Sequence, residues 1–557
     1  MEATKNFVWN VSVEEEKMKK YALISVSDKT GVEEFAKGLI GLGYEVISSG
    51  GTASTLTAAG VVNQQVQDIT GFAECLDGRI KTLHPNIYAA ILADRRVPDH
   101  MRQLSELDII PIDIVCVNLY PFAKTIAKDG CTIDDAVESI DIGGPAMLRA
   151  AAKNFAAVAV VCNPNDYGAV LKKLKDGRMD VVARKKLAQR AFEHTAFYDG
   201  MIQKYLKEGL DFPIQETLPF ELHEIPRYGE NADQAAAVYF DPMCADPLSL
   251  KFAKKLNGKA MSYNNYSDTQ AVINVLVEIG NQEPVCAIVK HEMSCGVAKG
   301  KNLFEAFTRA RDADTVSCFG GIVGFNKKLD EKTAKELLGI FVEIVIAPEF
   351  DAKALDVLKG KENLRVLELP ALAKLNAISG VDYKVLNGVM LAQVRQELAY
   401  KDLDFVTRVQ PSEQQMADLL FAFDVVKHTK SNGIVLAQDG QTVGIGGGPG
   451  RRDLAAKIAV WQAERLRPQG AKGAVAASDA FFPFADGPEE LIKAGVTAII
   501  QPGGSARDQD SIDLCNKYGI PMVFTGQRVF SHSAATSIPG KDLGVANSPH
   551  ETIDHKG

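Results

Sequence analysis

The sequence predicts an α/β protein in which parallel sheets carry helices on both faces. Short apolar runs that are typical of buried strands alternate with segments of helical periodicity along most of the chain, and this alternation favours parallel strands joined by crossover helices. The chain has 557 residues, more than one hydrophobic core usually serves, so about two to four domains are expected. A hydrophobic content of 46% and a charged content of 24% are ordinary for a folded protein.

The first predicted domain covers residues 20–215. A strand over residues 21–26 (YALISV) is followed by the turn SDKTG and a helical stretch. Residues 44–60 (YEVISSGGTASTLTAAG) repeat the order of strand, glycine-rich turn and helix, as do the segments IDIVCVNLYPF and FAAVAVVCNPNDYGAVLKKL. Residues 1–19 are interpreted as an N-terminal extension, whose charged run is most simply a solvated face.

The second predicted domain covers residues 216–532 and follows a linker. Residues 208–226 lose periodicity and contain three prolines, which indicates a connecting segment. Strand-like runs then resume, among them CAIVKH, FVEIVIAPEF, TAIIQPGG and PMVFTG. The segment is long for a single unit, so we expect two α/β subdomains that divide near residues 370–410. Residues 533–557 are interpreted as a C-terminal tail.

Charge and cysteine usage exclude several classes of protein. The formal net charge of −9 and the pI of about 5.6 imply no broad basic face, so long nucleic acid is not an expected partner. Local lysines and helix N-termini can still bind a small anion. The nine cysteines are scattered without a CxxC pair, which is typical of reduced thiols in the cytoplasm. No run reaches the roughly 18 apolar residues of a membrane span, and the N-terminus lacks the apolar core of a signal peptide. We therefore expect a cytoplasmic protein without membrane contact.

Three segments place a glycine-rich turn with a hydroxyl residue between a strand and a helix. Glycine lets the backbone approach a ligand, and the amides and dipole of the following helix favour an anion such as phosphate. Singly, each turn is as compatible with plain turn chemistry as with binding. GIGGGPG fails the GxGxxG spacing at its final glycine, and no Walker A motif is present. The segments are VISSGGTAS with Ser49, Gly50, Gly51 and Thr52, GIGGGPGRRD, and IIQPGGSARD.

Polar residues gather after several predicted strands of the first domain. Open α/β sheets bind ligands at the strand ends and in the loops that follow. Lysine and arginine in a partly dry loop can hold a phosphate or a developing oxyanion. Each residue alone is more simply a packing or capping residue, whereas together they indicate a site. They are Arg79, Lys81, Thr82 and His84 in GRIKTLHP, Tyr120 in VNLYPF, and Asp141, Gly143, Gly144 and Lys153 in IDIGGPAMLRAAAKN.

The adjacent pair Lys290 and His291 ends an apolar strand-like run in the second domain. A metal site, a proton relay and a buried structural pair are the possible interpretations. The zinc deaminase signature requires H-x-E followed by P-C-x-x-C, and neither spacing is present, so no catalytic metal is expected. A proton-transfer pair and a structural pair remain open on the residues alone.

A set of short motifs carries a resemblance to a known family. In chain order they are SVSDKTG, SSGGTAS, GRIKTLHP, NLYPF, IDIGGPAMLRAAAKN, RYGEN, VKH, KSN, SDAFFPF, IIQPGGS and MVFTGQR. Through them, residues 20–532 resemble the bifunctional purine biosynthesis family. This family joins a formyltransferase acting on phosphoribosylaminoimidazolecarboxamide (AICAR) to an IMP cyclohydrolase.

The resemblance implies a fold, a quaternary structure and a set of ligands. It implies an N-terminal methylglyoxal-synthase-like parallel sheet domain, followed by two cytidine-deaminase-like α/β subdomains without zinc. It also implies a homodimer whose transformylase sites are shared between subunits. The small-molecule partners would be AICAR, formyl-AICAR and IMP, with 10-formyltetrahydrofolate as co-substrate.

The family pattern also implies roles for individual residues. In the cyclohydrolase, the implied catalytic residues are Lys81, Tyr120, Asp141 and Lys153. The implied substrate-binding residues there are Ser27, Lys29, Thr30, Ser49, Gly50, Gly51, Thr52, Arg79, Thr82 and Gly143. In the transformylase, His291 would move a proton, with Lys290 and Asn432 at the reacting centre. Its implied substrate-binding residues are Arg227, Tyr228, Asn231, Glu343, Phe482 and Arg528.

The departures from the family pattern all fall in the second domain. They are Asp233, Met293, Ser294, Glu349 and Pro449. Two alternatives therefore stay open. One keeps the cyclohydrolase but has a transformylase half that is weak, lost or uses another formyl donor. The other is a nucleotide-binding regulatory protein, which the retained polar residues of both sites argue against.

Overall fold

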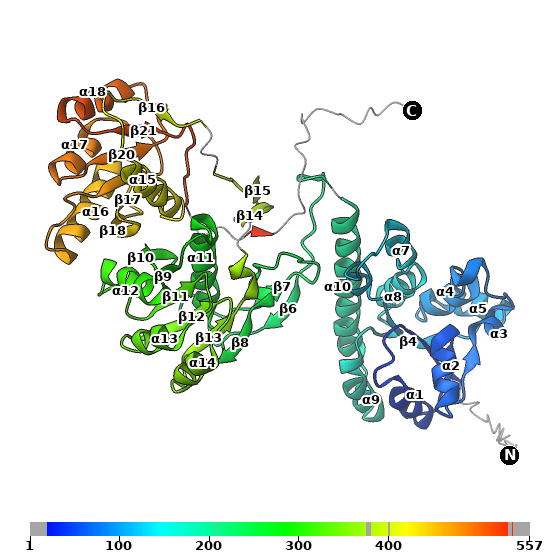
Figure 1. Cartoon of the computed structure of the whole chain (residues 1–557). Helices are drawn as coiled ribbons and strands as arrows, with labels where there is room; N and C mark the ends of the chain where they lie inside the picture. Colours follow the sequence, from blue (N-terminus) through cyan, green and yellow to red (C-terminus); the bar gives the residue numbers. More distant parts are fainter. Residues whose placement is uncertain (1–18, 208, 375–379, 399–401, 533–536, 539–557) are drawn as a thin grey trace, which may run out of the picture. The chain divides into compact units, whose positions relative to one another are not determined.

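The chain folds into two compact units. The computed structural model describes residues 19–207, 209–374, 380–398, 402–532 and 537–538. The first unit comprises residues 1–208 and 215–220, and the second comprises residues 209–214 and 221–557 (Figure 1). Both units combine helices with sheets, which confirms the predicted α/β class.

A five-stranded sheet in which all neighbours are parallel forms the centre of the first unit. Its order is β3-β2-β1-β4-β5, so the direction of strand addition reverses between β1 and β4. The interiors of these two strands are apolar and mostly buried, as expected for a sheet with helices on both faces. The strands are β1 (Lys20–Val26), β2 (Tyr44–Ser48), β3 (Gln64–Gln65), β4 (Ile112–Asn118) and β5 (Ala159–Val161).

The helices of the first unit follow the strands in the predicted alternation. Ligands of open α/β sheets bind beyond the carboxyl ends of the strands where the strand order reverses. Ser27, Ser49 and Tyr120 follow the ends of β1, β2 and β4, so the topology brings three predicted motifs to one edge. The helices are α1 (Val32–Gly41), α2 (Gly50–Ala58), α3 (Val66–Thr70), α4 (Pro85–Leu92), α5 (Pro98–Glu106), α6 (Phe122–Ile126), α7 (Ile133–Glu138), α8 (Gly143–Lys153), α9 (Tyr167–Lys175) and α10 (Val181–Leu206).

A single twelve-stranded sheet runs through the second unit in the order β16-β21-β20-β19-β17-β18-β10-β9-β11-β12-β13-β8. One half consists of β8 (Lys254–Asn257), β9 (Val285–Lys290), β10 (Met293–Lys299), β11 (Gly321–Phe325), β12 (Val342–Ala347) and β13 (Arg365–Glu368). The other consists of β16 (Asp404–Phe405), β17 (Ile434–Gln438), β18 (Gln441–Gly446), β19 (Val475–Ser478), β20 (Ala498–Gln501) and β21 (Met522–Phe524). The halves meet where β10 pairs antiparallel with β18.

The two halves of this sheet repeat one another. Read outward from the junction of β10 and β18, each has an antiparallel hairpin followed by three strands that are mutually parallel. Corresponding helices occupy corresponding places between them. They are α11 (Tyr263–Ile279), α12 (Leu303–Ala313), α13 (Glu331–Leu337) and α14 (Ala352–Lys359) in one half, and α15 (Glu413–Val426), α16 (Arg452–Leu466), α17 (Asp486–Lys493) and α18 (Asp508–Tyr518) in the other. One core cluster contains buried residues of both halves, so the two subdomains share a sheet and part of a core.

Two smaller sheets complete the described part of the second unit. β6 (Glu221–Glu224) pairs with β7 (Val238–Phe240). A hairpin of β14 (Val381–Val385) and β15 (Met390–Val394) also pairs with β22 (Ser537–Ile538). In the part of the chain that the structure describes, every helix is too short or too polar to cross a bilayer.

Close contact between helix and strand requires a residue without a side chain at one position on β10 and one on β18. A methyl carbon at Gly296 would lie 2.0 Å from the carbonyl oxygen of Ala310 on α12. Gly446 on β18 faces α16 in the same way, 2.0 Å from the carbonyl oxygen of Ala455. Glycine is therefore required at these positions because the helix backbone occupies the space of a side chain.

We expect Gly296→Ala to lower the free energy of unfolding of the second unit by about 1–3 kcal/mol, because the added methyl group must push α12 away from β10. Urea denaturation followed by circular dichroism measures the change. Gly168→Ala on α9 is the control, since a methyl carbon there meets nothing within 4 Å. Equal midpoints for Gly296→Ala and the unchanged chain would contradict this close packing.

Candidate active sites

The first candidate site lies at the carboxyl edge of the parallel sheet. Gly50 begins α2 with a φ of 51°, a conformation that glycine adopts without strain. The amides of Ser27 and Asp28 after β1 donate to the side-chain oxygen of Asn118 at the end of β4, at 2.6 and 2.8 Å. These two hydrogen bonds join the ends of β1 and β4, where the direction of strand addition reverses. Asn118 was not among the predicted site residues, although its place at a strand end within VNLYPF was a signal for it.

Lys81 brings the GRIKTLHP segment to the glycine-rich turn. A methyl carbon at Gly50 would lie 3.4 Å from Lys81 Nζ, so the ammonium group lies against the turn. Lys81 Nζ also forms an ion pair with Glu74 Oε1 at 3.2 Å, and its side chain remains 32% exposed. The ammonium group is therefore accessible beside amides that suit a phosphate or an oxyanion.

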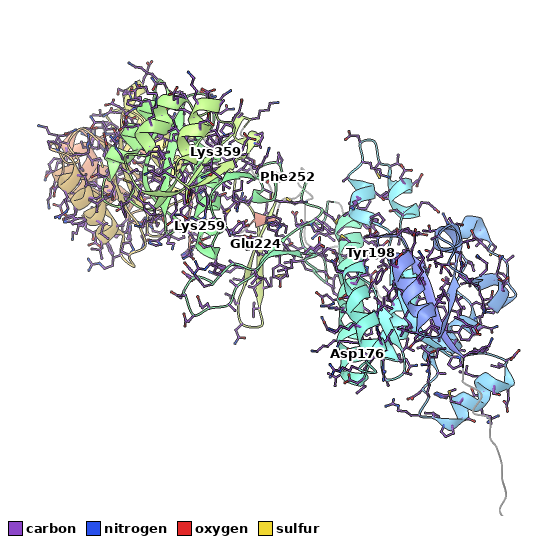
Figure 2. All side chains as sticks on the ribbon, turned by 90° about the horizontal axis from the view of Figure 1, so that it is seen from below. Asp176, Tyr198, Glu224, Phe252, Lys259 and Lys359 are labelled. Carbon is purple, nitrogen blue, oxygen red and sulfur yellow. The ribbon has the colours of Figure 1, made fainter. Side chains whose placement is uncertain are left out.

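Asp141 lies just before the N-terminal end of α8. Its side-chain oxygen accepts the amide of Gly144 at 2.8 Å, and burial raises the pKa of the carboxyl group. The amide of Asp141 donates to the hydroxyl of Tyr198 at 2.9 Å, and that hydroxyl donates to the carbonyl of Ser139 at 3.2 Å. Tyr198, which is labelled on α10 in Figure 2, thus holds the backbone that carries Asp141.

Other predicted residues of this domain lie in different surroundings. The Thr52 hydroxyl is buried and bonds to the backbone of Val26, so it ties α2 to β1. Burial lowers the pKa of Lys29, whose ammonium group donates to the carbonyl of Val26. Thr82 lies against α8, because a methyl carbon at Gly143 would be 2.8 Å from its hydroxyl.

Arg79 and Lys153 are not brought to Asp141, whereas Tyr120 lies beside it. Arg79 forms an ion pair with Glu138 and is largely exposed. Lys153 is exposed in the last turn of α8, which at 1.5 Å per residue lies about 15 Å along the axis from Gly143. Tyr120 is 49% exposed beside Asp141, whose carboxylate accepts its amide.

The second candidate site contains the Lys290–His291 pair at the hairpin between β9 and β10. Met293 pairs with Lys290, so His291 and Glu292 alone form the turn, with φ values of 55° and 59°. Two successive positive φ values are the mark of a type I′ turn, which side chains other than Gly, Asn and Asp adopt at a cost. Lys290 Nζ donates to the carbonyl of Phe319 at 2.9 Å, while His291 is exposed.

Asn432 is held by a buried ionic network. Its side-chain oxygen accepts from Arg452 at 2.6 Å, and its amide nitrogen donates to the carbonyl of Pro449 at 3.0 Å. Arg452 forms an ion pair with Asp479, and these side chains are 5% and 0% exposed. The Ser431 hydroxyl donates to the same carboxylate at 2.6 Å. The Asn432 amide is thus fixed in orientation by charges that have no access to solvent.

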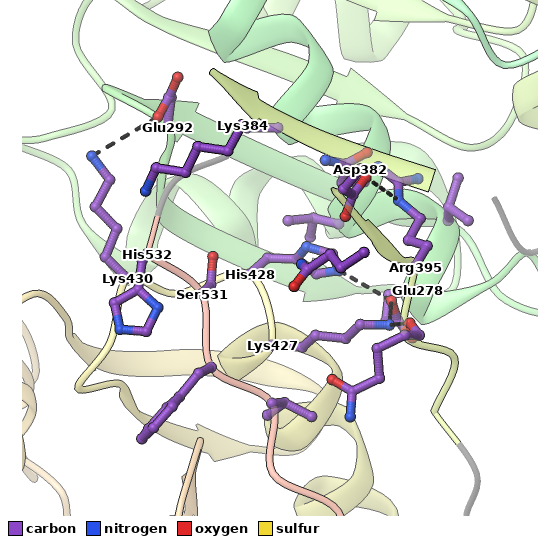
Figure 3. A pocket seen from close by; sticks show the side chains of 18 of the residues that line it. Glu278, Glu292, Asp382, Lys384, Arg395, Lys427, His428, Lys430, Ser531 and His532 are labelled. Carbon is purple, nitrogen blue, oxygen red and sulfur yellow. Dashed lines mark hydrogen bonds and ion pairs between the residues drawn. The ribbon is translucent and has the colours of Figure 1, made fainter. Parts of the chain in front are cut away.

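Two cavities adjoin these residues. The larger, of about 1320 Å³, is lined by α11, the β14–β15 hairpin and residues 427–430 and 528–532 (Figure 3). The smaller, of about 510 Å³, is lined by Asn432, by the Phe481 and Phe484 side of the SDAFFPF segment, and by Asp486. Arg528 and Phe530 line both, with the guanidinium carbon 4.6 Å from the ring centre.

A cluster of partly buried titratable side chains anchors the wall of the larger cavity. Glu278 on α11 accepts from Lys427 Nζ at 2.7 Å and lies 3.1 Å from His428 Nε2 (Figure 3). Lys427 Nζ also donates to the carbonyl of Gln396 at 2.9 Å, which attaches the base of the hairpin. Burial lowers the pKa of His428.

Several predicted substrate contacts of the second unit lie outside both cavities. Phe482 is 1% exposed and packs in the core, whereas its neighbours Phe481 and Phe484 line the smaller cavity. Glu343 forms an ion pair with Arg365 at 2.5 Å on adjacent strands. Asn231 bonds to Gln234 in an exposed loop that also contains Arg227 and Tyr228. Among the described residues, no group of three or more acidic, histidine or cysteine side chains could hold a metal ion.

Comparison with known proteins assigns the chain to a family. The family model described as AICARFT/IMPCHase bienzyme matches residues 151–462, and the MGS-like domain model matches residues 31–146. The bifunctional purine biosynthesis protein PurH of Acetivibrio thermocellus is 50% identical over 522 residues, which are 92% of this chain and 100% of the relative. PurH of Bacillus cereus is 49% identical over 522 residues, with the same coverage. A crystal structure titled ForH is 36% identical, with a TM-score of 0.29, and the match covers 33% of this chain and 94% of that one.

The chain belongs to the AICARFT/IMPCHase bienzyme family. It is therefore a bifunctional AICAR formyltransferase and IMP cyclohydrolase, which catalyses the last two steps of IMP synthesis. The MGS-like match confirms the fold predicted for the N-terminal domain. A folate co-substrate follows from the formyltransferase activity, and the alternative of a regulatory protein without enzyme activity is wrong.

The buried ionic network around Asn432 leads to a prediction about the stability of the second unit. Arg452→Leu should lower the free energy of unfolding of the second unit by about 3–5 kcal/mol, because the buried charge of Asp479 is left without an opposite charge. Urea denaturation of the full chain measures the loss. Arg452→Leu combined with Asp479→Asn should be less destabilised than Arg452→Leu alone. A double variant less stable than the single one would contradict the assignment of the loss to an unpaired charge.

Proposed function

We propose that the Ser49–Thr52 turn, Lys81 and Asp141 together form the site of the cyclohydrolase reaction. The observation that carries the proposal is the position of Lys81 Nζ against Gly50, which places a cation beside the amides at the start of α2. This pairing suits a nucleotide that is anionic at one end and develops an oxyanion at the other.

The chemistry of ring closure fits these groups. The carboxamide nitrogen of formyl-AICAR attacks the carbon of its own formyl group, and the formyl oxygen leaves as water. The reaction is intramolecular, so holding the two groups in contact lowers much of the barrier. Lys81 donates to the formyl oxygen as charge develops on it, and Asp141 accepts the proton of the attacking nitrogen. Burial, which raises the pKa of Asp141, makes its carboxylate a stronger base.

We propose that formyl transfer uses His291, Lys290 and Asn432. The 5-amine of AICAR attacks the formyl carbon of 10-formyltetrahydrofolate, loses its proton to the imidazole of His291, and displaces the folate nitrogen. The fixed Asn432 amide orients the reactants. The smaller cavity, with Phe481, Phe484 and Asp486 in its lining, suits the flat, hydrogen-bonding ring system of a folate. Arg528, which lines both cavities, suits the nucleotide phosphate.

Neither step requires a metal-activated water, and we propose that both proceed without one. The acceptors and donors named above supply the proton transfers. The nine cysteines are free thiols, which supports a reducing compartment and hence the cytoplasm.

We also propose that the chain works as a homodimer. The β14–β15 hairpin exposes Leu386, Val389 and Met390, which are 44%, 52% and 40% accessible. A contiguous apolar hairpin of this kind is a common mark of a protein interface. A second copy of the chain is the partner that the family resemblance implies.

Two substitutions in the full chain test the assignment of Lys81 to the cyclohydrolase reaction and of His291 to formyl transfer. Lys81→Ala should reduce cyclohydrolase activity by about 2–4 kcal/mol of transition-state stabilisation, and formyl-AICAR should accumulate from AICAR and 10-formyltetrahydrofolate. His291→Ala should instead stop formyl transfer while supplied formyl-AICAR is still converted to IMP. Chromatography of the products, with and without a chelator, measures both steps. Wild-type cyclohydrolase rates in Lys81→Ala would remove Lys81 from the mechanism, and loss of either activity with chelator would refute the metal-free proposal.

The proposed dimer has its own test. Analytical ultracentrifugation of the unchanged chain should give twice the chain mass of 60.2 kDa. Replacement of Val389 by Asp and Met390 by Lys should shift the equilibrium toward the monomer, because charged side chains resist burial in an interface. Cyclohydrolase activity of the variant serves as the control for folding. A monomeric unchanged chain would contradict the proposal.

A further inference from the structure

The turn that carries His291 is held by a carboxylate from a neighbouring helix. The amide of Glu292 donates to Asp268 on α11 at 2.7 Å, and the amide of His291 donates to the same carboxylate. Burial raises the pKa of Asp268. The side chain of Glu292 also faces Lys430, at 3.9 Å (Figure 3). Both residues of the turn are thus fixed through their backbone, which leaves the imidazole of His291 exposed.

The other half of the sheet contains an equivalent hairpin turn that is also held by a carboxylate. The hairpin between β17 and β18 turns at Asp439 and Gly440, with φ values of 53° and 68°. Their amides donate to the two carboxylate oxygens of Asp418 on α15, at 2.9 and 2.7 Å. Asp268 and Asp418 occupy equivalent positions, each six residues after the N-cap serine of its helix, Ser262 or Ser412.

The two turns differ in the residues that they hold. Asp-Gly is a favoured pair for a type I′ turn, because glycine adopts a positive φ without strain. His-Glu is not, so the turn of the first half depends more strongly on its carboxylate. Of the two side chains that make this turn unfavourable, Glu292 lines the larger cavity and His291 is exposed.

We propose that Asp268 is a positioning residue of the formyltransferase, which holds the His291–Glu292 turn in a left-handed conformation and so sets the place of the imidazole. The proposal rests on the proton-accepting role proposed for His291. Asp268 acts through the backbone and does not touch the substrate. Asp418 performs the same structural task at a turn that bears no reacting group.

The repeat supplies a matched control for the test. Asp268→Ala should lower kcat for formyl transfer by about ten- to a hundredfold, because a displacement near 1 Å at a reacting group can cost that much. KM for AICAR should change less. Asp268→Asn, which keeps an acceptor oxygen, should retain more activity than Asp268→Ala. Asp418→Ala should leave formyl transfer within about threefold of the unchanged enzyme, since glycine keeps its turn in place.

A second substitution separates positioning from general damage. Glu292→Gly gives the turn the glycine of the other half, so the effect of Asp268→Ala should shrink to about threefold or less in a Glu292→Gly background. Hydrogen exchange at the amides of residues 291 and 292 should accelerate in Asp268→Ala and stay slow in Asp268→Asn. Cyclohydrolase activity, measured on the same samples, should stay constant throughout.

The outcomes distinguish this inference from the role of His291 itself. Full formyl transfer by His291→Ala would overturn that role and, with it, the catalytic purpose of the turn. If His291→Ala is inactive but Asp268→Ala turns over like the unchanged enzyme, the inference alone is wrong. An equal loss in Asp418→Ala, or an undiminished loss in the Glu292→Gly background, would likewise overturn it.

Discussion

The antiparallel pairing of β10 with β18 is the contact on which the formyltransferase half depends. It joins two repeats of one α/β module into a twelve-stranded sheet, at Ala298 and Gln441. The Thr442 hydroxyl reinforces the junction by accepting the amide of Val297 at 3.0 Å. Glycines on both strands also let α12 pack closely against β10 and α16 against β18.

The junction brings residues of the two repeats to one place. The amide of Lys430 donates to the sulfur of Met293 at 3.3 Å, so the segment that precedes Asn432 lies against the hairpin that carries His291. A methyl carbon at Gly447 would be 2.5 Å from the terminal carbon of the same Met293. The site proposed for formyl transfer draws on both repeats, so its residues are spread over a long stretch of sequence.

In the first unit, a parallel sheet brings the loops together. Its strand order brings the loops after β1, β2 and β4 to one edge. Asn118 then fixes the loop after β1, and Tyr198 holds the backbone just before α8. The sequence was therefore a good guide to which loops of this unit lie together. Hydrophobic alternation predicted the strands, and the rule for open sheets predicted where polar residues would meet.

The sequence was a poorer guide where a residue's direction depends on tertiary packing. The sequence SDAFFPF does not distinguish Phe482, which points into the core, from Phe481 and Phe484, which line the smaller cavity. Lys153 shares a motif with Asp141, but the length of α8 separates them. The repeat of α11 and α15 was hidden because the shared features are a serine N-cap and an aspartate six residues later, with little else in common.

Separate nucleotide sites in the two units are the centre of this account, and a crystal structure of the enzyme with both IMP and AICAR tests them most directly. We predict the IMP phosphate at the amides of the Ser49–Thr52 turn, with its base beside Lys81 and Asp141. We predict the amine of AICAR within reach of His291 and its phosphate at Arg528. Both nucleotides in one unit, or AICAR bound away from the His291 hairpin, would contradict the account.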